Sequence, residues 1–213
     1  MSEHPILFCA GMVRAILDGR KNQTRRIVNP SIAPIVNECF KFNGKWCNHT
    51  FGYELGELCP YGIEGNRLWV RETFRHFGNK FQDGKSFALV TYRQDGSSRE
   101  IEVQNPPKEK WWNTGKTPWK PSIYMRRWAS RITLEITGVR VDRLQDISRD
   151  DAAAEGVDCK TCPTTESAES IVKGYGVHKV DYVAGYKSLW KSINGKGSWD
   201  ANPWVWCLTF KKL

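Results

Sequence analysis

The chain has 213 residues, of which 40% are hydrophobic, so it is long enough to bury a core. Its 32 Lys and Arg residues outnumber its 23 Asp and Glu residues, and the formal net charge of +9 favours partners that carry phosphate. No run approaches the roughly 18 apolar residues of a membrane span, and the N-terminus lacks the features of a signal peptide. We therefore expect a cytoplasmic protein that does not associate with membranes.

The seven cysteines are an odd number in a chain without an export signal, which favours free thiols in a reducing compartment. Four possible zinc ligands lie close together in the sequence: Cys39, Cys47, His49 and Cys59. Their gaps do not match a standard finger or ribbon, and the pair Cys159 and Cys162 has no second pair at a regular distance. We expect neither a bound metal nor a cofactor.

The regular elements begin with a short strand at residues 6–8. Apolar residues then recur at helical spacing and predict a short helix that Gly19 terminates. A β-prone pair follows at Ile27 and Val28. Residues 30–64 are rich in Pro, Gly and Asn, so we expect an insertion or a long ordered loop there.

The middle of the chain combines one strand with a second expected insertion. Residues 68–74 alternate as a strand, on which Glu72 shares a face with three apolar residues. Residues 87–103 resemble a hairpin, and residues 105–122 have the composition of a loop. We place the second insertion at about residues 76–122.

The last third of the chain gives the clearest signals. A long strand is predicted at residues 131–144, with Gly138 marking a bulge or bend. Ser148 starts a pattern that resembles a capping box and opens a helix that stops at Gly156. A further helix and a final strand are expected at residues 182–193 and 204–210.

This sequence of elements indicates the fold class. Short strands with helices between them, and no repeated βαβ rhythm, predict an α+β fold with a curled sheet or a small barrel. The chain contains no internal repeat, linker or low-complexity tract. We therefore expect one domain across residues 1–213, decorated by the two insertions.

The segment at residues 19–26, Gly-Arg-Lys-Asn-Gln-Thr-Arg-Arg, is the most informative for function. We expect it at an exposed rim, where five side chains could contact phosphate or a base: Arg20, Lys21, Gln23, Arg25 and Arg26. Lys21 and Thr24 are three positions apart, so the amine could reach the hydroxyl. A Lys whose pKa is lowered by burial or by other cations can activate a Thr hydroxyl as a nucleophile. A solvated cationic turn is the alternative.

The order of the motifs carries more information than any one of them. In chain order they are GRKNQTRR after a short helix, GNRLWVRETF, RITLEITGVRVDRL, DISRDDAAAEG and WVWCLTF. This order resembles the ASCH family, a branch of the PUA-like RNA-binding barrels, and most of all its larger members from phages and prophages. The resemblance implies a PUA-like small β-barrel with flanking helices and long loop insertions.

The resemblance also implies a catalytic site. A small bacterial member of the family is an amidohydrolase that removes the acetyl group from N(4)-acetylcytidine, and its G-[RK]-K-x-x-T segment is similar to residues 19–24. The implied roles are Thr24 as nucleophile, Lys21 as its base and Glu155 as acid/base toward the leaving amine. An exposed helical Glu is the alternative for Glu155. Glu72 is a rival acid, unless Arg71 or Arg131 holds it in a structural ion pair.

Residues 110–131 contain four Trp, one Tyr and six basic residues. Such interleaving suits a platform for single-stranded nucleic acid or a flipped base, in which Trp119 would stack. Arg126, Arg127 and Arg131 are the candidates for phosphate, because Arg contacts phosphate in a bidentate fork. The alternative is that the Trp side chains pin a long loop to the core.

These observations lead to one leading function and two alternatives. The leading hypothesis is an amidohydrolase that removes an acyl group from the exocyclic amine of a modified cytidine, with a nucleoside or single-stranded RNA as its partner. The first alternative is a non-catalytic module that reads RNA or a modified base. The second is a ribonuclease, although no pair of His residues is placed to act as acid and base.

Overall fold

The computed structural model describes residues 2–37, 39–42, 45–48, 58–83, 85–104, 117–157, 164–166 and 178–213. The strands in these ranges are β1 (Glu3–Leu7), β2 (Gln23–Ile27), β3 (Cys39–Phe42), β4 (Lys45–Asn48), β5 (Arg67–Arg71), β6 (Phe74–Gln82), β7 (Lys85–Tyr92), β8 (Ser98–Glu102), β9 (Thr133–Arg143), β10 (Thr164–Glu166), β11 (His178–Val180) and β12 (Trp204–Lys212). The α-helices are α1 (Ala10–Leu17), α2 (Ala33–Asn37), α3 (Arg149–Ala154) and α5 (Tyr182–Asn194). Short 3-10 helices are η3 (Ser122–Tyr124), η4 (Arg127–Ala129) and η5 (Leu144–Asp146). This mixture confirms the α+β class.

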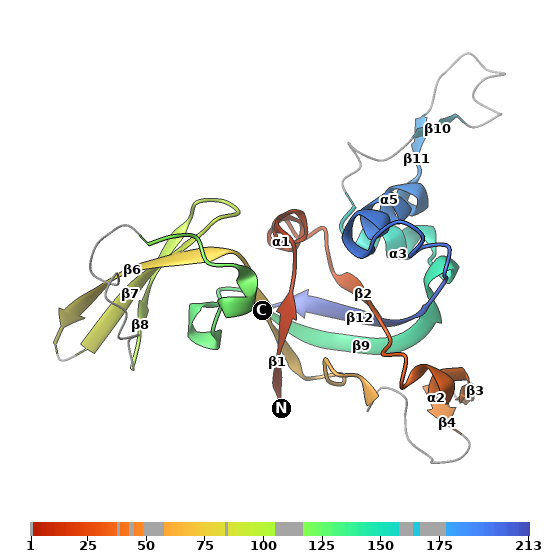
Figure 1. Ribbon diagram of the computed structural model, residues 1–213, viewed down its shortest axis with the longest axis horizontal. Helices are drawn as coiled ribbons and strands as arrows, with labels where there is room; N and C mark the ends of the chain where they lie inside the picture. Colours follow the sequence, from red (N-terminus) through yellow and green to blue (C-terminus); the bar gives the residue numbers. More distant parts are fainter. Residues whose placement is uncertain are drawn as a thin grey trace.

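Five strands form one curved sheet in the order β1-β5-β9-β12-β2 (Figure 1). β1 and β5 run parallel, and the other neighbours run antiparallel. The register of β9 and β12 shifts between Thr209 and Phe210, which pair with Gly138 and Ile136. The irregularity predicted at Gly138 is therefore confirmed.

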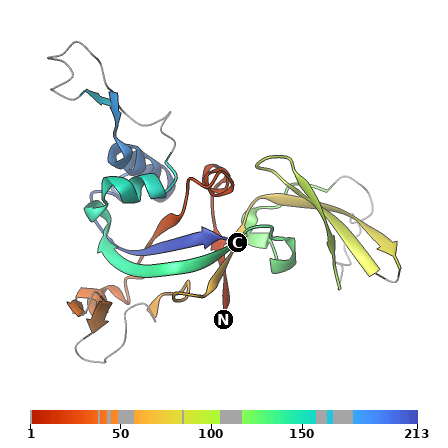
Figure 2. The ribbon, with the colours of Figure 1, turned by 180° about the vertical axis from the view of Figure 1, so that it is seen from behind.

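The edges of this sheet are β1 and β2, and α1 connects them (Figures 1 and 2). In the described ranges no backbone pairing joins β1 to β2, so these strands form an open, curved sheet rather than a closed barrel. A side-chain contact spans the two edges, because Arg26 Nη2 donates to the carbonyl of Leu7. The α+β class is thus established, while the PUA-like barrel stays a prediction.

The core of the molecule lies on both faces of β12. Side chains alternate along a strand, so Trp206 and Leu208 join one buried cluster with Val13 and Ile16 of α1. On the opposite face, Cys207 joins a second cluster with aromatic residues of α5. α3 and α5 pack against each other on that face (Figure 1).

β6, β7 and β8 form a separate antiparallel sheet, here called the β6–β8 sheet. It extends from the five-stranded sheet on the side away from α3 and α5 (Figure 1). Only Glu72 and Thr73 separate β5 from β6, and Phe74 is buried together with Met125 at the base of the β6–β8 sheet. The hairpin predicted at residues 87–103 is confirmed, and this sheet takes up much of the expected second insertion.

The predicted helix boundaries agree with the structure. Gly19 follows α1 with a φ of +73°. Ser148 Oγ accepts a hydrogen bond from Asp151 N at 3.1 Å and so caps α3, as the capping pattern predicts. The helix predicted at residues 182–193 is α5. Among the described helices, none is long and apolar enough to cross a membrane.

Candidate functional site

Lys21 and Glu155, two of the predicted catalytic residues, form a buried ion pair. Lys21 Nζ lies 2.7 Å from Glu155 Oε2, and neither side chain is more than 1% exposed. The same ammonium donates to two main-chain carbonyls, that of Glu155 at 2.8 Å and that of Gln23 at 2.7 Å. Because an ammonium has three N–H donors, these contacts use all of them.

Gly156 allows the two residues to meet. Lys21 and Glu155 form an isolated antiparallel bridge where the chain leaves α1 and α3. A Cβ on Gly156 would lie 2.7 Å from Lys21 Cβ and 2.8 Å from Ala15 Cβ, closer than real Cβ atoms come. Its φ of +76° also lies in the left-handed region that favours glycine. The sequence thus places a glycine where both the space and the backbone demand one.

The buried position changes the proton affinity of Lys21. Burial lowers the pKa of its ammonium, and the nearby charge of Arg26 lowers it further. The Glu155 carboxylate acts in the opposite direction but does not cancel the effect of burial. Lys21 is therefore easier to deprotonate than a lysine in water.

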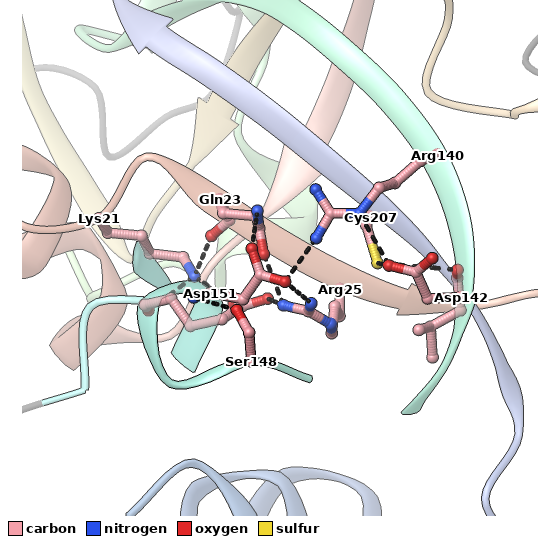
Figure 3. Close-up of polar contacts among 10 residues, drawn as sticks. Lys21, Gln23, Arg25, Arg140, Asp142, Ser148, Asp151 and Cys207 are labelled. Carbon is pink, nitrogen blue, oxygen red and sulfur yellow. Dashed lines mark hydrogen bonds and ion pairs between the residues drawn. The ribbon is translucent and has the colours of Figure 1, made fainter. Parts of the chain in front are cut away.

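A second layer of polar side chains surrounds the pair (Figure 3). Arg25 Nη1 lies 3.4 Å from Glu155 Oε1, and Arg25 Nη2 donates to Asp151 Oδ2 at 2.8 Å. Asp151 also accepts from Gln23 Nε2 at 2.9 Å and from Arg140 Nη2 at 2.6 Å. Burial alone would raise the pKa of Asp151, but hydrogen bonds from Gln23 and Arg140 and the charge of Arg25 lower it to about 2. The network therefore holds Asp151 as a carboxylate.

The expectation of an exposed rim at residues 19–26 is wrong for half of that segment. Lys21, Gln23, Thr24 and Arg25 are all buried. Two carboxylates, Asp151 within α3 and Glu155 directly after it, neutralise the cations, which makes their burial possible. The Arg25 side chain is 0% exposed, so it acts within this network rather than as a surface contact for phosphate.

Two arginines of the same segment lie nearer the surface. Arg20 is exposed, with Nη2 at 3.0 Å from Asp18 Oδ2 and Nη1 at 3.4 Å from the carbonyl of Gly156. Arg26 is half-buried, and its guanidinium lies 5.1 Å from the centre of the Phe8 ring. Of the predicted contacts in the segment, these two keep access to a ligand.

Thr24 and Glu155 line one small pocket of about 140 Å³ at the free edge of β2, between α1 and α5. Three residues of this pocket carry buried donors without a partner among the described residues: Arg25 Nε, Arg26 Nε and Trp190 Nε1. The three hydrogen bonds of Lys21 Nζ all go to other acceptors than the Thr24 hydroxyl. Thr24 and Glu155 thus line the same pocket, and Glu155 is hydrogen-bonded to Lys21. Lys21 Nζ makes no direct hydrogen bond to the Thr24 hydroxyl.

A second and larger cavity, here called the aromatic groove, lies between the end of β5, the start of β6 and the segment 119–128. Its volume is about 850 Å³. Three of the predicted binding residues line it: Trp119, Arg126 and Arg127. Three further residues of the predicted tract 110–131 line it as well: Lys120, Tyr124 and Trp128. Trp69, Arg71 and His76 also line it, although the sequence did not predict them as part of a binding surface.

Three of the predicted binding residues, Glu72, Arg127 and Arg131, form ion pairs. Glu72 is buried and accepts two hydrogen bonds from Arg131, from Nε at 2.8 Å and from Nη2 at 2.9 Å. The structural pairing that the sequence left open is therefore present, with Arg131 as the partner. Arg127 Nε donates to Glu3 Oε2 at 2.7 Å, on the surface. Arg126 has no such partner among the described residues, which leaves it as the cation of this group best placed for phosphate.

Only some of the possible zinc ligands lie within the described residues. Those residues contain no group of three or more potential metal ligands. Cys59 is buried in the main core, and burial raises the pKa of its thiol to about 11. The side chains of Cys39 and Cys47, like residues 49, 159 and 162, lie outside the described part of the chain.

Sequence reasoning missed two sets of site residues. The sequence indicated Asp151 only as part of a helix cap, because its partner Arg25 lies more than a hundred positions away. It indicated Arg140 only as a strand residue, although Arg140 also contacts Asp151. Trp69 and Arg71 belong to the strand face opposite Leu68. That alternation was the available signal, since it directs these two large side chains to the opposite face of the strand from Leu68.

Comparison with known proteins assigns neither a family nor a function to the chain. The chain matches no family profile, no curated protein and no solved structure. The ASCH resemblance therefore depends on the motifs of the sequence, and the site must be interpreted from its own geometry.

Proposed function

We propose that this protein recognises a nucleoside or single-stranded RNA and hydrolyses an acyl group from the exocyclic amine of a modified cytidine. The observation that carries the proposal is the buried Lys21–Glu155 ion pair in contact with the pocket that Thr24 lines. Moving each ion out of water costs several kcal/mol, so such pairs are concentrated at functional sites. The PUA-like fold and ASCH membership belong to this proposal.

The pair can supply both a base and an acid. Transfer of one proton along the 2.7 Å hydrogen bond converts the ammonium and carboxylate into an amine and a carboxylic acid. Burial lowers the pKa of the Lys21 ammonium and so favours the loss of its proton. In the neutral form Lys21 can accept a proton while Glu155 can donate one.

The proposed reaction uses these two protonation states. Thr24 Oγ bonds to the acyl carbon as Lys21 takes the hydroxyl proton, for which Lys21 exchanges one carbonyl contact for Thr24. The C–N bond then breaks, and the amine leaves with the proton of Glu155. Water cleaves the resulting Thr24 ester, which releases the carboxylic acid and restores the hydroxyl. The unpartnered donors Arg25 Nε, Arg26 Nε and Trp190 Nε1 are candidates to contact the acyl oxygen.

The size of the pocket limits what enters it. Its volume of about 140 Å³ is below the roughly 300 Å³ at which sites for drug-sized ligands begin. It therefore suits one ring or one acyl group rather than a whole nucleotide. The sugar and any further nucleotides would remain outside the pocket.

A second candidate is a non-catalytic module that reads RNA or a modified base. It is favoured by the saturation of Lys21 Nζ, whose three hydrogen bonds hold the ends of α1 and α3 to β2. In this case the ion pair is a structural clamp, and the pocket binds its ligand without changing it.

The two candidate functions are distinguished by incubating the purified protein with N(4)-acetylcytidine. The release of cytidine is measured by chromatography. Thr24→Val removes the hydroxyl at nearly constant size and should abolish release, whereas Thr24→Ser keeps a hydroxyl and should retain part of the rate. Equal rates for wild type and Thr24→Val would remove Thr24 from the mechanism. A folded wild type that binds the nucleoside but releases no cytidine would select the non-catalytic module.

A further inference from the structure

The aromatic groove is built by two parts of the chain that are distant in sequence. One side comes from the end of β5 and the start of β6, with Trp69, Arg71 and His76. The other side comes from the segment that contains η3 and η4, with Trp119 and Tyr124. Neither the five-stranded sheet nor the β6–β8 sheet forms this groove alone. It exists because the β6–β8 sheet extends from β5.

Two aromatic side chains of the groove, Tyr124 and Trp119, are accessible, whereas Trp69 is buried. Tyr124 is 64% exposed and Trp119 is 37% exposed. The guanidinium of Arg75 lies 4.7 Å from the centre of the Trp119 ring, and that of Arg71 lies 4.7 Å from the Trp69 ring. The guanidinium of Arg93 lies 6.0 Å from the centre of the same Trp119 ring, so two cations hold this ring, and 37% of the residue remains exposed. The groove thus offers the exposed rings of Trp119 and Tyr124, of which Trp119 is held by neighbouring cations.

The charged residues described in the lining of the groove are all cationic. Arg71, Lys120, Arg126 and Arg127 line it, and none of its described lining residues is acidic. Arg127 is paired with Glu3, but Arg126 is exposed and has no ion-pair partner among the described residues. A polyanion would therefore enter the groove without displacing an internal carboxylate from Arg126.

We propose that the aromatic groove binds single-stranded nucleic acid, with bases stacked on Trp119 and Tyr124 and the backbone phosphates next to Arg126. Aromatic faces beside a basic strip are how proteins bind single strands without sequence preference. The volume of about 850 Å³ lies within the roughly 300–1,000 Å³ of small-ligand sites, so nucleotide-sized groups fit. A duplex keeps its bases stacked on one another and would not use the aromatic faces. This proposal does not depend on hydrolysis at Thr24.

The test is fluorescence anisotropy with a labelled single-stranded oligouridylate, titrated at several salt concentrations. Tyr124→Ala should weaken binding on the order of 10-fold and leave the salt dependence unchanged, because stacking releases no counterions. Arg126→Ala should lower the slope of log affinity against log salt by ~0.7, the value for one contact with a single strand. Single-stranded DNA should bind by the same residues, and duplex RNA should bind more weakly.

Arg99→Ala is the matched control, because Arg99 is an exposed arginine of β8 that does not line the groove. It removes the same charge and should leave both affinity and slope close to wild type. RNA binding by the wild-type protein is measured separately from cytidine release, so that failure of hydrolysis and failure of RNA binding can be told apart. The proposal is overturned if Arg126→Ala and Arg99→Ala behave alike, if Tyr124→Ala has no effect, or if an oligoglutamate peptide binds more tightly than the RNA.

Discussion

The Lys21 ammonium and the Glu155 carboxylate lie 2.7 Å apart although 134 positions separate them in the sequence. Both side chains are buried, so each charge depends on the other rather than on water. Arg25 Nη1, 3.4 Å from Glu155 Oε1, places a second cation beside the same carboxylate. The pair is therefore asymmetric: without Glu155 two cations would face each other, whereas without Lys21 an ion pair would remain.

This asymmetry predicts unequal losses of stability. Glu155→Gln should lower the free energy of unfolding by about 3–5 kcal/mol, as expected when one partner of a buried pair is removed. Lys21→Met should cost less, because Arg25 still neutralises Glu155. Urea unfolding of both variants and of the double variant gives a double-mutant cycle. Additive losses would contradict a direct interaction between the two charges.

Gly156 should tolerate no side chain, because a Cβ there would overlap Lys21 and Ala15. Gly156→Ala should therefore destabilise the protein by more than the about 1–2 kcal/mol of left-handed backbone strain alone. Gly19→Ala is the matched control: its φ of +73° is similar, but nothing lies within 4 Å of the added Cβ. Thermal unfolding of the two variants compares them directly. Equal losses would mean that the approach to Lys21 does not require glycine.

Arg131 is expected to stabilise the connection between the two sheets rather than to bind phosphate. It contacts Glu72, at the β5–β6 junction, and Asp95, in the β7–β8 turn, where Nη1 lies 2.7 Å from Oδ2. Arg131→Ala leaves the buried Glu72 carboxylate without this partner and should cost about 3 kcal/mol. Arg127→Ala breaks an exposed pair and should cost less than about 1 kcal/mol. Similar unfolding free energies for the two variants would contradict this assignment.

Acid should weaken the protein in a defined window. Hydrogen bonds and nearby cations lower the pKa of Asp151 from 3.8 to about 2, against the raising effect of burial. A carboxylate with a lowered folded-state pKa stabilises the fold above its unfolded pKa, and this contribution is lost as pH falls from about 4 toward 2. Asp151→Asn should flatten the pH dependence of unfolding in that window. Asp150→Asn, an exposed neighbour in α3 without a described ion pair, should leave it as in wild type.

Local patterns were sufficient to predict most of the regular elements. The periodicity of residues 131–144, the break at Gly138 and the cap at Ser148 each depend on neighbours in sequence, and each agrees with the structure. β6 was not predicted, because its polar sequence with Gly78 lacks a sustained alternation. Its partner β7 supplies the pairing that the local pattern does not indicate.

Burial of charge could not be predicted, because it depends on distant partners. The sequence predicted Arg25 as a surface contact. In the structure it instead contacts Asp151 and Glu155, which lie more than a hundred positions away in the sequence. Similarly, the Trp and Arg content of residues 119–128 indicated one side of the aromatic groove. The other side comes from the β5–β6 region and required the path of the chain in space.

The central claim is that the Lys21–Glu155 pair and Thr24 hydrolyse an acylated nucleoside, and counting product per protein molecule tests it most directly. Purified wild-type protein in the presence of excess N(4)-acetylcytidine should release many cytidines per chain, and Thr24→Val, folded to the same degree, should release none above the uncatalysed rate. Release of no cytidine by a folded wild-type protein, or equal release by Thr24→Val, would contradict the account.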